Sequence, residues 1–139
     1  LVEYRKVLEL SPDYSWAYFN IAQIYWELNR MDDAVLMLKK TIEKNPKDAE
    51  AYKLIAQILI KQGHLDEATE ILTKALDDIQ NGDLYYLMAK IFELNEDFDS
   101  YKDSLELAYE HKDSLTFNVG AVKNEIKQIE KSKHEKKQA

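Results

Sequence analysis

Cysteine is absent from the 139-residue chain, and glycine and proline are scarce, with 3 and 2 residues. The lack of cysteine excludes disulfide scaffolds, thiolate metal sites and cysteine nucleophiles. It leaves the compartment open, because an oxidising compartment does not require disulfides. So few Gly and Pro residues do not supply the turns that a many-stranded sandwich or barrel needs at every hairpin. The sequence therefore predicts a helical protein.

Long apolar runs are also missing from the sequence. No segment approaches the roughly 18 consecutive apolar residues that span a bilayer, so we expect a soluble protein without membrane insertion. The first six residues mix both charge signs before any apolar stretch, unlike a secretory signal. The cytoplasm is therefore the default expectation for its location. Because the first residue is not Met, we expect a fragment of a longer protein.

Hydrophobic residues make up 45% of the chain and charged residues 32%, which predicts a folded protein of one domain. The charge is unevenly distributed along it. Residues 1–115 hold 13 basic and 23 acidic side chains, whereas residues 116–139 hold 6 and 3. An acidic body argues against nucleic acid as the main ligand.

A repeat with a period of 34 residues runs through the sequence. Residues 16–25 match residues 50–59 in most columns, by identity or by aliphatic or aromatic character. A third copy follows one residue short of a second full period, and a half copy opens the chain. We therefore expect repeats over 15–48, 49–81 and 82–115, preceded over 1–14 by the second helix of a truncated repeat.

Each copy predicts two helices joined by a tight turn. In the first copy one apolar stripe at helical spacing is made by Tyr18, Ile21, Ala22 and Tyr25. Asn29 and Gly63 lie between paired stripes, and both residue types favour the left-handed conformation that ends a helix. Asn45–Pro46 and Ser11–Pro12 predict the ends of second helices, because the residue before Pro avoids helical geometry.

The period, the helix pairs and the signature positions resemble the tetratricopeptide repeat (TPR) family over residues 1 to about 115. In the first copy those positions hold Tyr18, Ile21, Ala22, Tyr25, Ala34, Leu38, Thr41 and Pro46. The third copy departs from the pattern, because Tyr101 occupies a position that is small in the family and Asp113 replaces Pro. A tyrosine there predicts a splayed helix pair or a ring turned outward. The resemblance implies an all-α fold, an α-α superhelix (TPR solenoid) of helix-turn-helix repeats.

Residues 116–139 do not continue the repeat. They carry one more apolar stripe, made by Val119, Val122, Ile126 and Ile129. The simplest interpretation is a C-terminal capping helix, because the last repeat of a solenoid exposes an apolar face that needs cover. The apolar residues stop after Ile129, so we expect a Lys-rich tail over 131–139 that is frayed or disordered.

Motifs of catalysis and metal binding are not found. The three histidines lie in an expected turn (His64), at an expected helix end (His111) and in the tail (His134). No His-Glu-x-x-His motif, Gly-rich phosphate loop or Gly-x-Ser-x-Gly elbow occurs. His64 with Glu67 is a weak metal pair, and a solvated turn histidine is the better interpretation. We therefore expect no enzyme, no cofactor and no metal site.

The resemblance also implies a concave surface, built from the first helix of every repeat, where extended partners dock. The candidate residues of this peptide-binding groove, at the family's ligand-facing places, are Trp16, Phe19, Gln23, Trp26, Lys53, Gln57, Ile60, Lys61, Tyr86 and Lys90. The remaining ligand-facing places fall on Glu27, Glu50, Asp83, Glu93 and Leu94.

The aromatic groove candidates Trp16, Phe19 and Trp26 lie off the apolar stripe of their helix, where a solvated face normally carries charge. A binding surface explains them, since Trp and Tyr dominate interface energetics. Packing against the missing first helix of the truncated repeat is the alternative for Trp16 and Phe19. Trp26 lies further from that helix and favours binding.

These observations predict a protein-protein interaction scaffold that binds an extended or helical peptide segment of a partner protein in the concave groove. Lys53, Lys61 and Lys90 would suit acidic residues beside a hydrophobic anchor of that partner. The alternative function is structural self-association of a larger TPR protein through its open N-terminal face.

One family subclass grips the C-terminal carboxylate of chaperone tails with Lys, Asn and Arg side chains on successive first helices. At those places this chain has Phe19, Gln23, Leu54, Asp83 and Leu87. The carboxylate clamp is therefore absent, and we expect no binding of chaperone tails through that mode.

Overall fold

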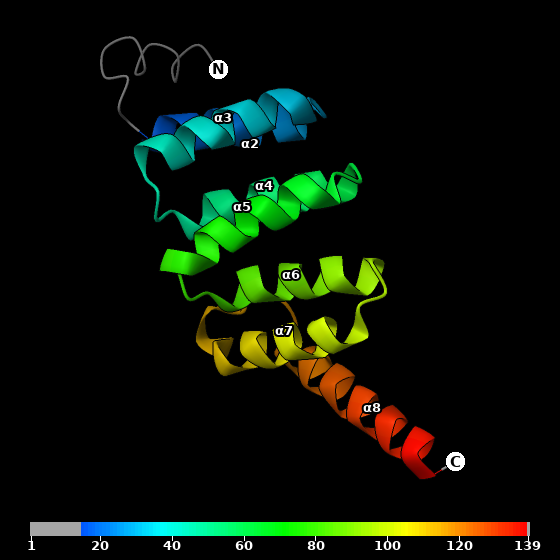
Figure 1. Ribbon diagram of the computed structural model, residues 1–139. Helices are drawn as coiled ribbons and strands as arrows, with labels where there is room; N and C mark the ends of the chain where they lie inside the picture. The colour runs from blue at the N-terminus through cyan, green and yellow to red at the C-terminus, as the bar shows by residue number, and fades with distance from the viewer. Residues whose placement is uncertain (1–14, 139) are drawn as a thin grey trace. The chain divides into compact units, whose positions relative to one another are not determined.

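A computed structural model describes residues 15–138 of the chain, with side chains through residue 132, and these residues form helices without strands. The predicted all-α fold is confirmed (Figure 1). The helices are α2 (Ser15–Glu27), α3 (Met31–Lys44), α4 (Ala49–Lys61), α5 (Leu65–Asp78), α6 (Gly82–Leu94), α7 (Phe98–Glu110), the short 3-10 helix η1 (Lys112–Ser114) and α8 (Val119–Gln138). The helix expected over residues 1–14 lies outside the described residues.

Contacts divide the chain into two compact units. The first unit is Leu1–Ile79 and the second is Gln80–Ala139. Helices α2 to α5 belong to the first unit, and α6 to α8 belong to the second. No helix of the described residues is long and apolar enough to cross a membrane.

The turn inside each helix pair contains one residue in the left-handed conformation. Asn29 has a φ of 60° and Gly63 a φ of 82°, as the sequence predicts. The third turn has Glu96 at a φ of 60°, a residue type that gives no signal for this conformation. In all three turns the residue after the left-handed one donates its N–H to the carbonyl oxygen five residues earlier. In the third turn Asp97 donates to the Phe92 carbonyl at 2.9 Å.

Replacing Glu96 with Gly is expected to raise the free energy of unfolding by about 0.5–1 kcal/mol. The left-handed conformation costs a residue with a side chain about 1–2 kcal/mol, and glycine removes this cost. Glycine also raises the conformational entropy of the unfolded chain, which offsets part of the gain in stability. Urea unfolding of both proteins measures the difference. The matched control is Asn95→Gly, because Asn95 has a φ of −85° and gains nothing from glycine. Equal effects of the two changes would contradict the assignment of strain to Glu96.

The first unit is built on close helix contacts at small residues. Within it α2 packs on α3, α3 on α4 and α4 on α5. The fully buried residues of these helices are Ala17, Ala22, Ala34, Leu38, Thr41, Ala51, Ile55, Ala56, Ala68 and Leu72. The alanines let the helix backbones approach each other, and the larger side chains fill the space between them. At the start of α4 the Asp48 carboxylate caps the helix by accepting from the Ala51 N–H at 3.2 Å.

The core of the second unit includes the segment that follows the last repeat. Its buried cluster contains Ala89, Tyr101, Leu105, Leu115 and Val122. The other three residues of the predicted C-terminal stripe, Val119, Ile126 and Ile129, pack against this cluster from α8. The prediction of a frayed tail is wrong for most of its length, because α8 continues to Gln138.

Tyr101 lies inside this core and not outside it. The side chain is 6% exposed, and its hydroxyl donates a hydrogen bond to the Glu125 carboxylate of α8. Burial raises the pKa of Tyr101, and the neighbouring Glu125 carboxylate raises it further. The prediction of an outward ring is therefore wrong. The extra bulk is accommodated because α8 packs over the ring and supplies a partner for its hydroxyl.

Candidate functional site

The first helices of the two repeats in the first unit, α2 and α4, share a cavity of about 350 Å³. Gln23, Trp26 and Glu27 line it from α2, and Leu54 lines it from α4. Three of these residues are at the predicted ligand-facing places. Leu54 lines the cavity although it is not at one of the family's ligand-facing places, and the sequence singles it out only as a departure from the chaperone-tail clamp. The cavity combines an indole and an aliphatic wall with an amide and a carboxylate.

Other candidate residues of the first unit lie outside the lining of this cavity. Trp16, near the start of α2, is 50% exposed. The partly exposed candidates are Phe19, Lys53, Gln57 and Ile60, and Lys61 is exposed. The indole of Trp26 is partly buried, so it is held in position while one part of its surface still faces solvent. Of the aromatic candidates, only Trp26 lines this cavity, and its ring is partly buried.

In the second unit the candidates Tyr86 and Lys90 are engaged by the chain's own C-terminal segment. The Tyr86 ring stacks on Phe117 with 4.6 Å between the ring centroids. The Lys90 Nζ lies 5.0 Å from the Tyr86 ring centroid, 3.5 Å from Glu93 Oε1 and 4.0 Å from Glu125 Oε1. A partner would have to displace these contacts to reach either side chain.

The charge of Lys90 belongs to this internal cluster. Burial lowers the pKa of Lys90, but its hydrogen bond to Tyr86 and the Glu125 and Glu93 carboxylates outweigh burial and raise the pKa overall. The ammonium group therefore stays charged and paired at neutral pH. Its surroundings make it a contact between α6 and α8.

Asp83 has a structural role that the family pattern does not indicate. It is 2% exposed, and its carboxylate oxygens accept from the Thr116 N–H and the Thr116 hydroxyl, both at 2.7 Å. Beside it the Gly82 N–H donates to Ser114 Oγ at 2.8 Å. Asp83 thus holds the segment before α8 against the start of α6. Its partner lies 33 residues further along the chain, where the repeat has ended, so periodicity gives no signal for this contact.

The described residues contain no group of three or more His, Cys, Asp or Glu side chains that could hold a metal ion. His64 precedes α5 in a turn and is exposed. His111 lies against Tyr85, with 5.3 Å between the ring centroids, and its Nδ1 is 3.0 Å from the Leu107 carbonyl oxygen. The two histidines whose side chains are described therefore occupy helix ends.

Comparison with known families adds to this picture. The model of the tetratricopeptide repeat matches residues 1–58 and 32–91. The chain belongs to the tetratricopeptide repeat family. Proteins of this family are generally non-catalytic scaffolds. No curated protein matches the sequence.

Solved structures similar to this protein include one that is described as a TPR protein. YrrB, described as a TPR protein with an unusual peptide-binding site, is 23% identical with a TM-score of 0.67; the match covers 79% of this chain and 57% of YrrB. One structure of MamA is 19% identical with a TM-score of 0.66, and the match covers 98% of this chain and 88% of MamA. A second structure of MamA is 20% identical with a TM-score of 0.69, and the match covers 97% of this chain and 79% of that chain. These similarities show the fold, an all-α solenoid of helical repeats.

Proposed function

We propose that this TPR protein binds an extended or helical peptide segment of a partner protein along α2 and α4, with Trp26 as the main anchor. The observation that carries this proposal is the cavity of about 350 Å³ lined by Gln23, Trp26, Glu27 and Leu54. A cavity of roughly 300 Å³ or more with apolar walls and a few polar groups is typical of ligand sites. The peptide-binding site of YrrB, a protein of similar fold, supports the same role.

The mechanism is preorganisation. The backbones of α2 and α4 are held by buried residues on their other faces, among them Ile21, Ala22, Ile55 and Ala56. Trp26 is therefore positioned before the partner arrives, which lowers the entropy cost of binding. Gln23 and Glu27 offer polar groups at the same cavity, and these would orient the peptide. The proposed groove is limited to the first unit, because Tyr86 and Lys90 already have partners in their own unit.

The proposed activity is binding without catalysis, and it does not include chaperone tails. Two places of the carboxylate clamp hold Phe19 and Leu54, which are apolar and partly buried. A third holds Asp83, whose charge would repel a carboxylate and whose oxygens are bound to Thr116. No cation is supplied at these places to pair with a terminal carboxylate.

Trp26→Ala is expected to weaken the affinity for a cognate peptide by about 30-fold, which corresponds to about 2 kcal/mol for an interface hot spot. The peptide is first selected from a displayed peptide library with the unchanged protein as bait. Isothermal titration calorimetry then measures its Kd for both proteins, after circular dichroism has shown equal helicity. The matched control is Trp16→Ala, for which we expect a smaller loss because Trp16 does not line the cavity. Equal affinities of the Trp26→Ala variant and the unchanged protein would refute the groove.

Self-association is the second candidate function. Leu28 and Leu36 of the first unit are both more than half exposed, and exposed aliphatic side chains of this size favour contacts between copies. Sedimentation equilibrium distinguishes the two functions. Self-association predicts an apparent mass that rises with concentration, and it predicts the same rise in Trp26→Ala. Peptide binding along α2 and α4 predicts a constant mass and a loss of binding in that variant.

A further inference from the structure

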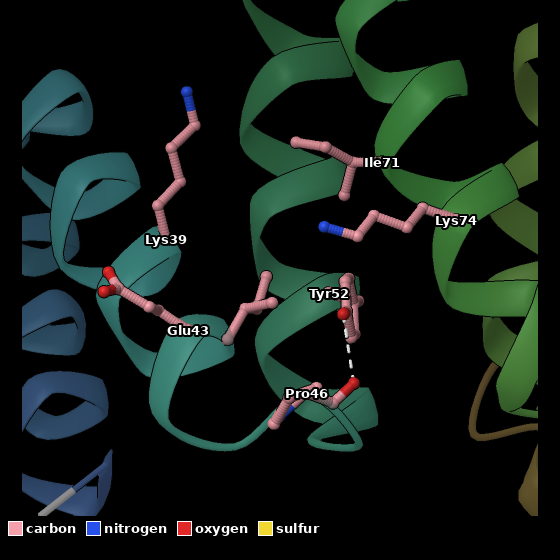
Figure 2. Close-up of a pocket in the computed structure, with 7 residues that line it drawn as sticks. Lys39, Glu43, Pro46, Tyr52, Ile71 and Lys74 are labelled. Carbon is pink, nitrogen blue, oxygen red and sulfur yellow. Dashed lines mark hydrogen bonds between the residues drawn. The ribbon is translucent and has the colours of Figure 1, made fainter. Parts of the chain in front are cut away.

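The second helices of the first unit, α3 and α5, share a cavity of about 450 Å³ that is larger than the one at Trp26 (Figure 2). Its apolar lining comes from Ile42, Pro46, Tyr52 and Ile71. No residue of α2 lines it, and α4 contributes only Tyr52. This cavity is therefore separate from the groove proposed above and does not depend on it.

The floor of this cavity presents carbon and no free hydroxyl. Tyr52 is 3% exposed, and its hydroxyl donates to the Pro46 carbonyl oxygen at 3.0 Å, the dashed line in Figure 2. Burial and the nearby Asp78 raise the pKa of Tyr52, so the hydroxyl stays neutral. With the hydroxyl bound to Pro46, the ring leaves an apolar surface that suits a bulky apolar side chain.

Two charged residues of this lining, Lys74 and Glu43, take part in no ion pair between described residues, and Lys74 lies over the apolar floor (Figure 2). Lys74 extends from α5 toward α3 (Figure 2). The Lys39 ammonium, by contrast, is 2.9 Å from Glu67 Oε1. The Glu43 carboxylate points away from Lys74 (Figure 2). An apolar ligand group with a carboxylate beside it would complement this end of the cavity.

The space between α3 and α5 is elongated. A second cavity, of about 310 Å³, is lined by Asp32, Leu36 and Lys39 of α3 and by Glu67 of α5. Because Lys39 lines both cavities, they follow one another along α3. From Asp32 to Pro46 this valley is about 20 Å long at 1.5 Å per helical residue, the length of roughly six extended residues, and the Lys39–Glu67 ion pair joins its two sides where the cavities meet. That shape fits an extended peptide better than a compact small molecule.

We propose that the valley between α3 and α5 is a second docking site, which takes an extended acidic peptide segment of a partner protein. A bulky apolar residue of that peptide fills the cavity over Tyr52, and a neighbouring Asp or Glu pairs with Lys74. The acidic residue belongs beside Lys74, on the side that faces away from the Glu43 carboxylate (Figure 2). The other end of the valley does not suit it, because there the cation Lys39 is already paired with Glu67 and Asp32 adds a negative charge. The first unit would then bind one peptide along α2 and α4, at Trp26, and a second peptide between α3 and α5.

The test uses peptides blocked at both ends, about seven residues long to match the valley, with a central Phe, Leu, Trp or Tyr between two Glu residues. A second set has Lys in place of Glu. The full chain labelled with 15N is titrated with each, and amide shifts give the location and the Kd. At least one Glu peptide is expected to shift amides of residues 39–45 and 71–74 in a saturable way. Its affinity should exceed that of the matching Lys peptide by about tenfold.

Lys74→Glu is expected to reverse this preference, so that the Lys peptide binds more tightly than the Glu peptide. Lys74 is exposed, and the change should leave the fold intact. Ile71→Ser, which removes part of the apolar lining, should weaken both peptide sets. Lys123→Glu makes the same charge change on α8 and should alter neither Kd.

Trp26→Ala separates this proposal from the first one. Binding in the valley should be the same in Trp26→Ala as in the unchanged protein. Shifts confined to α2 and α4, a loss of binding in Trp26→Ala, equal affinity for both charge sets, or no saturable binding of any peptide would each overturn the second site. Shifts confined to α2 and α4, or a loss of binding in Trp26→Ala, would support the groove at Trp26. Equal affinity for both charge sets, or no saturable binding, would leave that groove unaffected.

Discussion

Asp83→Ala is expected to lower the free energy of unfolding by about 3 kcal/mol and to loosen α8 from α6. The buried carboxylate accepts two hydrogen bonds of 2.7 Å from Thr116, and hydrogen bonds to a charged group are worth about 1.5–3 kcal/mol each. Desolvation of the carboxylate offsets part of that sum. Urea unfolding measures the loss, and hydrogen exchange of residues 115–130 shows whether it is located in the C-terminal segment.

Two substitutions separate the hydrogen bonds of Asp83 from other effects of losing a charge. Asp83→Asn keeps the size of the side chain and one carbonyl oxygen, so we expect about half the loss. Asp103→Asn removes an exposed charge from α7 and should change the stability by less than about 0.5 kcal/mol. If Asp83→Ala were as mild as Asp103→Asn, the contact with Thr116 would not hold the segment.

The loosening has a consequence for binding. The stacking of Tyr86 on Phe117 and the ion pair of Lys90 with Glu125 both depend on the position of the C-terminal segment. In the family pattern these two side chains face the ligand. When the segment is released, Tyr86 and Lys90 should become more accessible to solvent. In Asp83→Ala we therefore expect Tyr86 and Lys90 to be more exposed than in the unchanged protein.

The repeat made most of the fold predictable from the sequence. Apolar stripes and turn residues are local signals, so the left-handed turns at Asn29 and Gly63 follow from residue type and position alone. The stripe of the C-terminal segment is equally local, and Val122 is buried as it predicts. The left-handed turn at Glu96 was not predictable, because the long hydrogen bond of the turn determines its conformation and the residue type opposes it.

The candidate site was only partly predictable. Gln23 and Trp26 line a cavity of the first unit, where the family pattern holds. In the second unit Tyr86, Lys90 and Asp83 contact residues beyond position 114, and no period relates those residues to the repeat. The valley between α3 and α5 is invisible for another reason. A cavity is the space that side chains leave unfilled, and a sequence pattern records only the side chains that are there.

Gly82→Ala is expected to destabilise the second unit by about 3 kcal/mol, although alanine favours a helix over glycine by about 1 kcal/mol. A Cβ at Gly82 would lie 2.5 Å from the carbonyl oxygen of His111 and 3.0 Å from the Cβ of Leu115. The first of these atoms belongs to the backbone, so no side-chain rotation relieves the overlap. The segment would have to move away from α6 and lose the hydrogen bond from the Gly82 N–H to Ser114.

The other two glycines of the chain are the controls for this prediction. A Cβ at Gly63 meets nothing within 4 Å, so Gly63→Ala costs only the backbone strain of its φ of 82°, about 1 kcal/mol. A Cβ at Gly120 approaches only the Asn118 side chain, at 3.3 Å, and the change should stay within about 0.5 kcal/mol. Thermal and urea unfolding of the three variants should therefore rank them in this order. If Gly82→Ala were as mild as Gly120→Ala, the close approach of residues 111–115 to α6 would be wrong, and with it the contact that positions α8.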